Sequence, residues 1–334
     1  MPISKTLDEL LKATSRSFYL TLRVLPGTIR PQIGLAYLLA RTSDTIADTE
    51  IVPLEQRLNA LQLLRERILG THRQPLDFGE LAQRQGSPTE RILLERCEDA
   101  LAVLEQFNSA DQQRIQDTLK IITGGQELDL RRFAVASAEK IAALRTAEEL
   151  DDYTYRVAGC VGEFWTKMCR AHLFPRAALD DGKLLADGVR FGKGLQLVNI
   201  LRDLPADLRQ GRCYLPADEL SAVGLAPGDL LEPANEPKLR PLYDRYLRLA
   251  EGHLAAGWDY TNALPGRCVR VKLACAWPVL IGVRTLARLR ASNPLDPGQR
   301  IKISRAEVKG VIWRSVLFYP WPPAWRRLFS TASR

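Results

Sequence analysis

The sequence predicts an all-α protein, and three observations support this. Apolar residues recur at spacings of three and four, which places them on one face of a helix. They do so through residues 54–69, 92–107, 115–133, 184–204 and 239–254. Four Ser or Thr residues stand three positions before a Glu, the usual signature of a helix start. No run of residues alternates between apolar and polar as a half-buried strand does.

The predicted helices follow one another with short interruptions. The four start signals are Thr6 with Glu9, Ser87 with Glu90, Thr146 with Glu149, and Ser304 with Glu307. The two longest loops are predicted at residues 75–88 and 222–237, because both stretches are polar and contain Gly and Pro. Ser304 is a good N-cap for a helix that begins at Arg305.

The chain has 334 residues and 46% hydrophobic content, which is enough to bury a large core. No linker divides it, so we expect a single domain over residues 1–334. Its core is expected at about residues 10–315, followed by an aromatic and basic tail at 316–334.

Two pairs of aspartates have the spacing of one helical turn. Asp203 and Asp207 form one pair, and Asp44 and Asp48 form the other. Residues four apart on a helix lie about 5–6 Å from one another between Cβ atoms, so both carboxylates reach one cation. Magnesium takes one or two carboxylates and completes its shell with water and phosphate oxygens. Two such pairs indicate sites for polyanionic groups.

The surroundings of each pair strengthen this interpretation. Gln196 and Asn199 share a polar helix face with Asp203, and apolar residues lie between them. Tyr37 and Arg41 lie on the same stripe as the first aspartate pair, about two turns and one turn before it. An aromatic ring, a cation and two carboxylates on one face are typical of the wall of a binding site.

Four segments together resemble the squalene and phytoene synthases, the head-to-head prenyl transferases. They span residues 15–26, 37–48, 153–162 and 196–216, and they occur in the order and spacing of that family. Residues 273–278 and 300–305 are similar to late segments of the squalene synthase branch. The resemblance implies a class I isoprenoid synthase helical bundle with a central cavity.

The resemblance also implies a reaction. Two farnesyl diphosphates would condense to presqualene diphosphate, which would rearrange and be reduced by NADPH to squalene. Mg²⁺ would be bound by Asp44, Asp48, Asn199, Asp203 and Asp207. Ser15, Arg16, Ser17, Arg41, Gln196 and Arg212 would bind the diphosphate. Tyr153 would remove a proton or stabilise a cation, with Tyr37 and Arg41 beside it in the catalytic cavity.

One segment departs from the family pattern. The family usually has an acidic residue directly before the second aspartate of the second pair, where this chain has Ala206. Pro205 also removes a backbone donor in mid-helix and is expected to kink the helix there.

The use of NADPH depends on the resemblance alone. Lys302 and Arg305 would pair with the cofactor's phosphates, together with Arg212. The chain has no Gly-rich dinucleotide fingerprint. The alternative interpretation is that Lys302 is an exposed strand-like or loop residue before the helix.

Three hypotheses therefore stay open. The first is a squalene synthase. The second is an enzyme that stops at dehydrosqualene, or that makes phytoene from longer prenyl chains, without NADPH. The third is a non-catalytic scaffold of the same fold, which would be expected to lose its acidic pairs.

Composition bounds the partners. The net charge of +8, from 47 basic and 39 acidic residues, suits either a solvated basic surface or attraction of polyphosphates and anionic headgroups. The arginines belong to no nucleic-acid-binding motif, so we expect no nucleic-acid partner. We expect a cytoplasmic monomer with reduced cysteines and neither a secretory signal nor a membrane span.

The C-terminal tail favours contact with the inner face of the membrane. Its aromatic residues alternate with Arg314, Arg326 and Arg327, a mixture that suits the headgroup boundary. The alternative interpretation is that the aromatic rings cap the helical core.

Overall fold

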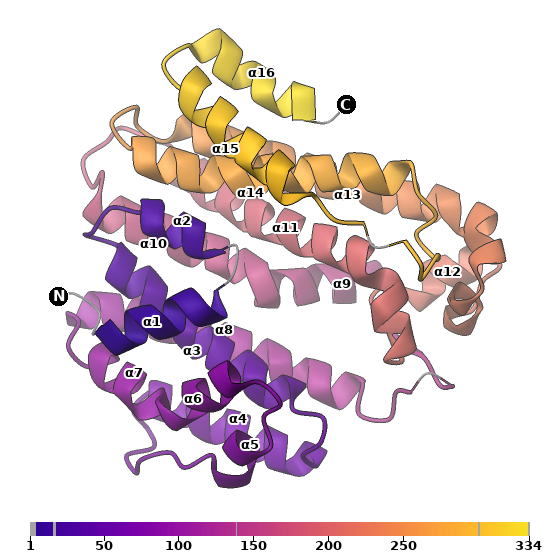
Figure 1. Ribbon diagram of the computed structural model, residues 1–334, viewed down its shortest axis with the longest axis horizontal. Coiled ribbons are helices and arrows are strands. Elements are labelled where there is room, and N and C mark those ends of the chain that lie inside the picture. Colours follow the sequence, from indigo (N-terminus) through magenta and orange to yellow (C-terminus); the bar gives the residue numbers. More distant parts are fainter. Residues whose placement is uncertain (1–4, 16–17, 138, 300, 333–334) are drawn as a thin grey trace. The chain divides into compact units, whose positions relative to one another are not determined.

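The computed structural model describes residues 5–15, 18–137, 139–299 and 301–332. Helices make up nearly all of its regular structure, which confirms the all-α prediction (Figure 1). The chain forms two compact units. One contains Met1–Ala134 and Phe164–Arg176, and the other contains Val135–Glu163 and Ala177–Arg334. Helix α10 (Cys160–His172) runs from the second unit into the first.

The first unit holds the first eight helices. They are α1 (Lys5–Thr14), α2 (Phe18–Val24), α3 (Arg30–Asp48), α4 (Leu54–Ile68), α5 (Gly79–Gln83), α6 (Pro88–Glu95), α7 (Cys97–Leu104) and α8 (Ser109–Arg132). Helix α3 is central, because it packs against α8, α4, α7 and α6. Its side chains Leu35, Leu39 and Ile46 are fully buried.

A buried carboxylate joins three helices of this unit. Asp111 on α8 has no exposed surface and lies 2.8 Å from Nε2 of His172 on α10. Nε2 of Gln32 on α3 donates to it at 3.2 Å. Burial by itself would raise the pKa of Asp111, but the hydrogen bonds from His172 and Gln32 outweigh it and lower the pKa. The charged form of Asp111 therefore helps to fix α3 against α8 and α10.

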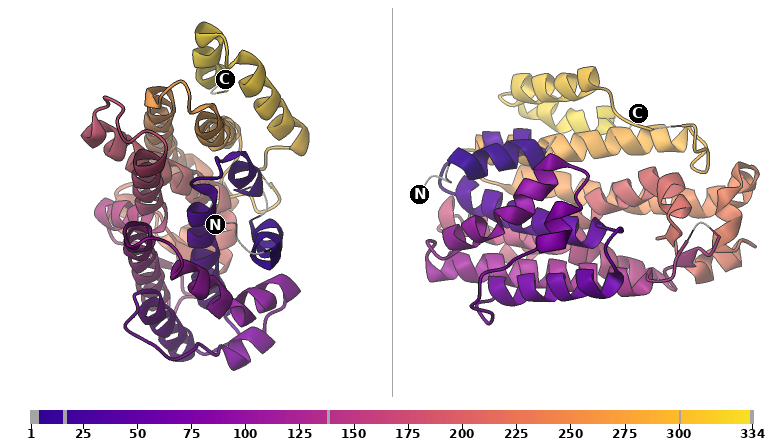
Figure 2. Two further views of the ribbon diagram at one scale, coloured as in Figure 1. Left: turned by 90° about the vertical axis from the view of Figure 1, so that its left-hand side faces the viewer. Right: turned by 60° about the horizontal axis from the view of Figure 1, so that its bottom comes forward.

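The second unit holds the other elements. They are β1 (Ala142–Ala143), α9 (Ala147–Thr154), η1 (Tyr155–Gly159), α11 (Asp181–Arg209), β2 (Arg212–Cys213), α12 (Ala217–Ala222), η2 (Pro227–Leu231), η3 (Pro233–Asn235), α13 (Glu236–Ala263), α14 (Val269–Arg290), α15 (Arg305–Phe318) and α16 (Pro322–Ala332). Helix α11 packs along α13, and α14 packs against both. Helices α15 and α16 pack on α14 and on each other (Figure 2).

A turn of π-helix, η1, lies directly on α11. A Cβ atom added at Gly192 of α11 would lie 2.1 Å from the carbonyl oxygen of Ala158, so no larger residue fits at this crossing. Short π-helical turns are frequent at functional sites. This one follows Tyr153 and Thr154 at the end of α9.

Most predicted helices are confirmed, with local corrections. The segment 92–107 is interrupted at Arg96 and forms α6 and α7. The predicted loop 75–88 contains α5, and the loop 222–237 contains the two short 3₁₀ helices η2 and η3. Local packing of Leu81 and Ala82, both buried, gives residues 79–83 a helical turn that their polar neighbours did not predict.

The helix start predicted at Ser87 is confirmed, because α6 begins at Pro88 with Ser87 as its N-cap residue. The capping box predicted there is wrong, since the Ser87 side chain makes no cap hydrogen bond and Glu90 accepts from Arg41. The start predicted at Thr6 is displaced. Thr6 lies inside α1, which begins at Lys5. The Ser304 and Glu307 capping box is confirmed in full.

The structure also bears on the predictions for the Thr146 cap, for the cysteines and for membrane spans. The side chain of Thr146 accepts from the backbone of Glu149, as expected of an N-cap. Each of the six cysteines is a buried thiol. Within the described ranges, no helix is both long and apolar enough to cross a membrane. Whether the chain forms a single domain with a central cavity depends on how the two units are placed relative to each other. This stays a prediction.

Candidate functional site

The first aspartate pair lies at the C-terminal end of α3. The opposite face of this helix, with Leu38, Leu39 and Ile46, is buried in the first unit. The Asp44 side chain is 48% exposed, and Asp48 is exposed. Nε2 of Gln126, on α8, donates a hydrogen bond to Oδ1 of Asp44. The core packing of α3 thus presents both carboxylates on its open face.

Arg41 is held beside the pair but away from direct contact. Its Nη2 donates to Oε1 of Glu90 on α6 at 2.6 Å, while its Nη1 stands 3.9 Å from Oδ2 of Asp44. The shortest hydrogen bond of the Arg41 guanidinium is therefore made to α6. The guanidinium remains close enough to contribute positive charge near Asp44.

The electrostatics of Asp44 differ from those of an ordinary surface carboxylate. Burial and the negative charge of Asp48 raise its pKa to about 6, and Arg41 and the Gln126 hydrogen bond only partly oppose this rise. Because about half of the side chain is exposed, solvent screens part of the effect. The ionised pair is a site of concentrated negative charge that a cation would stabilise.

The predicted residues near the start of the chain have structural partners. The Tyr37 hydroxyl donates to the carbonyl oxygen of Thr14 at 3.1 Å. The Ser15 hydroxyl is buried and donates to the carbonyl oxygen of Leu11. Tyr37 is half-buried on the same helix as the aspartates. Arg16 and Ser17, predicted to bind phosphate, lie outside the described residues.

The second aspartate pair lies near the end of α11 and has a different partner. Both oxygens of Asp203 accept from its neighbour Arg202, at 2.8 Å from Nε and 2.5 Å from Nη2. The Asp203 side chain is 45% exposed and that of Arg202 is 35% exposed. Asp203 also raises the pKa of Arg202, chiefly through this hydrogen bond. Asp203 is thus neutralised within its own helix.

The polar face predicted around Asp203 is confirmed by burial. Asn199 is exposed, and Gln196 and Asp207 are half-buried. The other face of α11 is buried, including Leu201 and Leu204.

Pro205 does not end the helix. Helix α11 continues through it to Arg209, one turn beyond. The pair Asp203 and Asp207 therefore stays on a continuous helix.

The turn after α11 is anchored by a short parallel β-bridge. Gly211 has φ +79, and a Cβ there would lie 2.4 Å from the backbone nitrogen of Ser137. Residues Arg212 and Cys213 form β2, which pairs with Ala142 and Ala143 of β1. Only glycine fits this turn, and the turn fixes the backbone of Arg212 relative to the end of α11.

Tyr153 lies next to this anchored turn through an aromatic contact. Its ring stacks on Tyr214 with centroids 4.6 Å apart and an interplanar angle of 26°. Tyr214 is buried and follows β2 directly. The stack links the end of α9, where Tyr153 lies, to the segment that carries Arg212.

Lys302 and Arg305, predicted to bind a dinucleotide, lie in the segment that leads into α15. Arg288 on α14 donates to the carbonyl oxygen of Lys302 and pairs with Glu307 at 2.6 Å. Arg305 is exposed in the first turn of α15. The side chains of Lys302 and Arg305 therefore lie on a segment that is fixed through its backbone.

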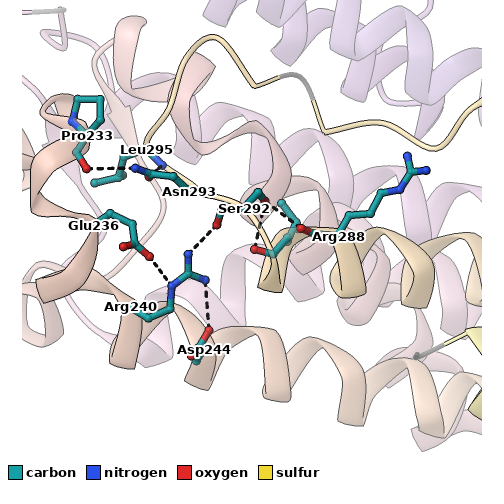
Figure 3. Close-up of polar contacts among 9 residues, drawn as sticks. Pro233, Glu236, Arg240, Asp244, Arg288, Ser292, Asn293 and Leu295 are labelled. Carbon is teal, nitrogen blue, oxygen red and sulfur yellow. Dashed lines mark hydrogen bonds and ion pairs between the residues drawn. The ribbon is translucent and has the colours of Figure 1, made fainter.

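The start of this segment is tied to α13. As Figure 3 shows, the guanidinium of Arg240 contacts Glu236 and Asp244 on its own helix and donates to the carbonyl oxygen of Ser292 at 2.6 Å. The amide of Asn293 donates to the carbonyl oxygen of Pro233 at 3.2 Å. These contacts hold the end of α14 against α13.

The two pairs differ in how they fit a magnesium ion. At α3, repulsion from Asp48 contributes to the raised pKa of Asp44, so a bound cation would offset part of this electrostatic repulsion. At α11, a cation would have to replace Arg202 on Asp203. The described residues contain no cluster of three or more His, Cys, Asp or Glu side chains suited to a metal.

The structure brings the predicted residues together in two groups. Tyr37, Arg41, Asp44 and Asp48 share α3 in the first unit. The second unit holds Gln196, Asn199, Asp203 and Asp207 on α11, with Arg212 and Tyr153 near its end, and Lys302 and Arg305 on the segment before and into α15. That the two aspartate pairs face a shared chamber stays a prediction.

Comparison with known proteins decides the family. A family model described as squalene/phytoene synthase matches residues 11–307. The chain belongs to the squalene/phytoene synthase family. It is 27% identical to a bifunctional lycopene cyclase/phytoene synthase of Leptosphaeria maculans, over 95% of this chain and 50% of that protein. It is also 27% identical to the squalene synthase of Schizosaccharomyces pombe, over 92% of this chain and 64% of that protein.

The chain thus spans about half to two thirds of these relatives' length. Among solved structures, a ligand complex of TcSQS superposes with a TM-score of 0.80 at 21% identity, covering 98% of this chain and 89% of that one. This likeness confirms the predicted isoprenoid synthase fold of the squalene synthase type.

The sequence alone did not reveal three of the partners in these sites. Gln126 contacts Asp44 across 82 positions of sequence, and nothing local indicates that contact. Glu90 was predicted as a helix-capping residue rather than as the partner of Arg41. The stacking of Tyr214 on Tyr153 has no local signal either. The adjacency of Arg202 and Asp203 was the one visible signal.

Proposed function

We propose that this protein condenses two farnesyl diphosphates head to head, through presqualene diphosphate, to squalene, with Mg²⁺ and NADPH. The observation that carries the proposal is the presence of two aspartate pairs on the open faces of α3 and α11 in a chain of this family. Ionising an allylic diphosphate requires the leaving group's negative charge to be neutralised. Bound Mg²⁺ would supply most of that positive charge as a Lewis acid.

Side chains of this chain would bind the cations and the phosphate oxygens. Asp44 and Asp48 would bind a cation at α3, and Asp203, Asp207 and Asn199 would do so at α11. Arg41 stands 3.9 Å from Asp44, near enough to pair with a phosphate oxygen that the cation also binds. Its hydrogen bond to Glu90 helps to hold the guanidinium at that position.

Arg212 and Gln196 would hold a diphosphate beside the α11 pair. The anchored turn at Gly211 keeps the Arg212 backbone in one place, which favours a defined ion pair over a mobile one. Tyr153 would face the reacting carbon chain. Its stack on Tyr214 limits its rotation, so its ring or hydroxyl would meet a carbocation or proton at a fixed position. Tyr37 would line the same cavity.

The second candidate is synthesis of dehydrosqualene or phytoene without NADPH. It is favoured by the similarity to the Leptosphaeria maculans phytoene synthase, which is as high as that to the squalene synthase. Both candidates share the first half of the reaction and the same aspartate pairs. They differ in the reductant and in the length of the prenyl chain. A non-catalytic scaffold is the third, and the presence of both acidic pairs argues against it.

The test is a product analysis. The purified protein is incubated with magnesium and radiolabelled farnesyl diphosphate, with and without NADPH, and in parallel with geranylgeranyl diphosphate. Squalene that forms only with NADPH is the expected result. Presqualene diphosphate or dehydrosqualene regardless of NADPH, or phytoene from the longer substrate, would select the second candidate. No conversion of either diphosphate would contradict enzymatic function.

The NADPH part has a separate control. Lys302 and Arg305 are proposed to pair with cofactor phosphates together with Arg212. Lys302→Gln with Arg305→Gln should raise the NADPH concentration needed for squalene formation, without changing the rate of presqualene diphosphate formation. An unchanged NADPH requirement would remove these two residues from the proposal.

We further propose that the protein works as a monomer in the cytoplasm, in peripheral contact with the inner face of the membrane. Support comes from the net charge of +8 and from exposed aromatic residues near the C-terminal end of the described chain. A product as apolar as squalene leaves water most readily at such a surface.

A further inference from the structure

A cavity of about 380 Å³ lies among the last three helices of the second unit. It is lined by residues of α14, α15 and α16, namely Leu280, Arg284, Val311, Arg314, Phe318, Ala324, Arg327, Leu328, Thr331 and Ala332. None of the aspartates or other residues proposed for the reaction is among them. The cavity is therefore a feature apart from the two aspartate pairs.

Three arginines contribute to the lining, one from each helix. Arg284 lies on α14, Arg314 on α15 and Arg327 on α16. Their side chains form no ion pair or hydrogen bond with any other residue that the structure describes, and no Asp or Glu lines the cavity. Elsewhere on α14, Arg288 pairs with Glu307 and Arg290 pairs with Glu251. The cavity thus collects arginines whose charge no residue in the described part of the chain neutralises, and an anion would bind them favourably.

The rest of the lining is apolar. Leu280, Val311, Phe318 and Leu328 supply hydrocarbon and aromatic surface around the arginines. A small hydrated anion would gain nothing from this surface. A molecule with an anionic group and a hydrocarbon portion would match both parts of the lining.

The outer face of α15 continues this apolar character on the surface. Trp313 is 72% exposed, Val316 51%, Leu317 47% and Trp321 57%. Their spacing of three, four and eight positions from Trp313 places them on one face of the helix, extended past its end. Large exposed apolar residues that cluster in this way mark a surface that binds a partner. Trp is also typical of the boundary between membrane and water.

The other tail aromatics have a structural role. The Trp325 ring stacks on Trp258 of α13 with centroids 5.2 Å apart, and its Nε1 donates to Oδ1 of Asn262 at 2.8 Å. The hydroxyl of Tyr319 donates to the carbonyl oxygen of Gly266 at 2.8 Å. These contacts fix α16 and the end of α15 to the body of the unit, so Trp313 and Trp321 project from a rigid support.

We propose that this cavity binds the phosphate headgroup of an anionic phospholipid in a bilayer. Arg284, Arg314 and Arg327 hold the phosphate, and the exposed face of Trp313, Val316, Leu317 and Trp321 enters the headgroup layer beside it. The proposal rests on the membrane contact included in the proposed function and specifies which residues make it. It does not depend on which prenyl diphosphate the protein converts.

The test is flotation of the full chain with vesicles of phosphatidylcholine alone and of phosphatidylcholine mixed with phosphatidylglycerol. The protein should float with the mixed vesicles only. Arg327→Gln should weaken that binding about fivefold, the effect of one basic residue at an anionic surface. Arg326→Gln is the matched control, since Arg326 is exposed on the same helix but does not line the cavity. It should change binding less than twofold.

A second variant separates a specific site from general attraction of charge. Ala324→Leu fills part of the cavity and leaves every arginine in place. It should weaken binding to the mixed vesicles by at least as much as Arg327→Gln, while circular dichroism and the thermal midpoint confirm the fold. Millimolar inorganic phosphate is added in a separate arm. Because the apolar lining and α15 require a lipid, phosphate alone should displace little of the bound protein.

Three results would overturn the proposal. The first is equal loss in Arg326→Gln and Arg327→Gln together with an unaffected Ala324→Leu. The second is equal flotation with both kinds of vesicle. The third is full displacement by inorganic phosphate. Conversion of farnesyl diphosphate in detergent solution is measured for each variant as well, so a failure of lipid binding is distinguished from a failure of the proposed reaction.

Discussion

The aspartate pairs of α3 and α11 have the same spacing and different electrostatic states. At α3, partial burial and then the negative charge of Asp48 raise the pKa of Asp44 to about 6. The nearest arginine there, Arg41, is drawn away by Glu90. At α11, Asp203 is held on both oxygens by Arg202. Asp44 thus lies 3.9 Å from an arginine whose shorter contact is to Glu90, whereas Asp203 is paired on both oxygens within its own helix.

This difference shows that a motif spacing does not determine the state of a site. Two carboxylates four residues apart guarantee a shared helix face. The charge balance on that face depends on groups from other helices, such as Gln126 and Glu90, or on the adjacent residue.

The largest expected effect is the loss of turnover when either pair is broken. Asp48→Asn and Asp203→Asn should each lower the rate of farnesyl diphosphate consumption by a factor of about 10³ or more, because an ionising diphosphate would lose a cation that stabilises it. Circular dichroism should show an intact fold. Turnover within tenfold of the unchanged protein at saturating magnesium, in either variant, would remove that pair from the site.

Next in size is the effect of the anchored turn, which only the α11 pair has. Gly211→Ala places a Cβ against the Ser137 backbone at a φ of +79, which L-residues rarely adopt. We expect a loss of about 1–3 kcal/mol of unfolding free energy and a raised KM for farnesyl diphosphate, because Arg212 moves. Urea unfolding and steady-state kinetics measure the two effects. Gly224→Ala, also at positive φ but with no atom near the added Cβ, is the control for backbone strain alone.

Smaller still is the effect of freeing Asp203. Arg202→Gln should lower the magnesium concentration for half-maximal activity about fivefold, since an exposed ion pair of about 1 kcal/mol no longer competes with the cation. Arg209→Gln removes an exposed arginine from the same helix and is the control. If both variants shift the magnesium requirement equally, the Arg202 pair has no special role.

The smallest effect concerns stability and has opposite signs at the two pairs. The folded pKa of Asp44 is raised above its unfolded value, so ionising it costs stability as pH rises from about 4 through about 6. Asp44→Asn should therefore be more stable than the unchanged protein at pH 7.5, by about 1 kcal/mol after discounting for its exposed half. Below pH 4 the two should be equally stable.

Asp203→Asn loses the Arg202 ion pair and should be less stable at pH 7.5, by about 0.5–1 kcal/mol. Urea unfolding in EDTA at both pH values measures all of these differences. The same sign at both positions would contradict the contrast between the pairs.

The helices were predictable because their signals are local. The spacing of apolar residues located α4, α8, α11 and α13 to within a few residues at most ends, and the capping box at Ser304 located the start of α15. Errors arose where a distant group competed for a local one, as when Arg41 took Glu90 from its expected cap. Short helices such as α5 depend on the burial of a few side chains. The mostly polar composition of that segment predicted a loop instead.

The candidate residues on α3 and α11 were predictable from helical periodicity and from family resemblance. Their partners were not, because Gln126 and Tyr214 reach them only through the fold. The interpretation that the tail aromatics cap the core holds for some of them only, and membrane contact stays a prediction. Trp325 caps the core, while Trp313 is exposed. The local sequence does not distinguish the two outcomes, because both rings lie in helical segments with arginine neighbours.

The central claim is that each aspartate pair binds a divalent cation together with a diphosphate. Manganese replaces magnesium in this measurement, and its electron paramagnetic resonance signal counts bound ions in the presence of a non-ionising farnesyl diphosphate analogue. We predict that Asp48→Asn and Asp203→Asn each bind fewer manganese ions per chain than the unchanged protein. An undiminished count in both variants would contradict the account.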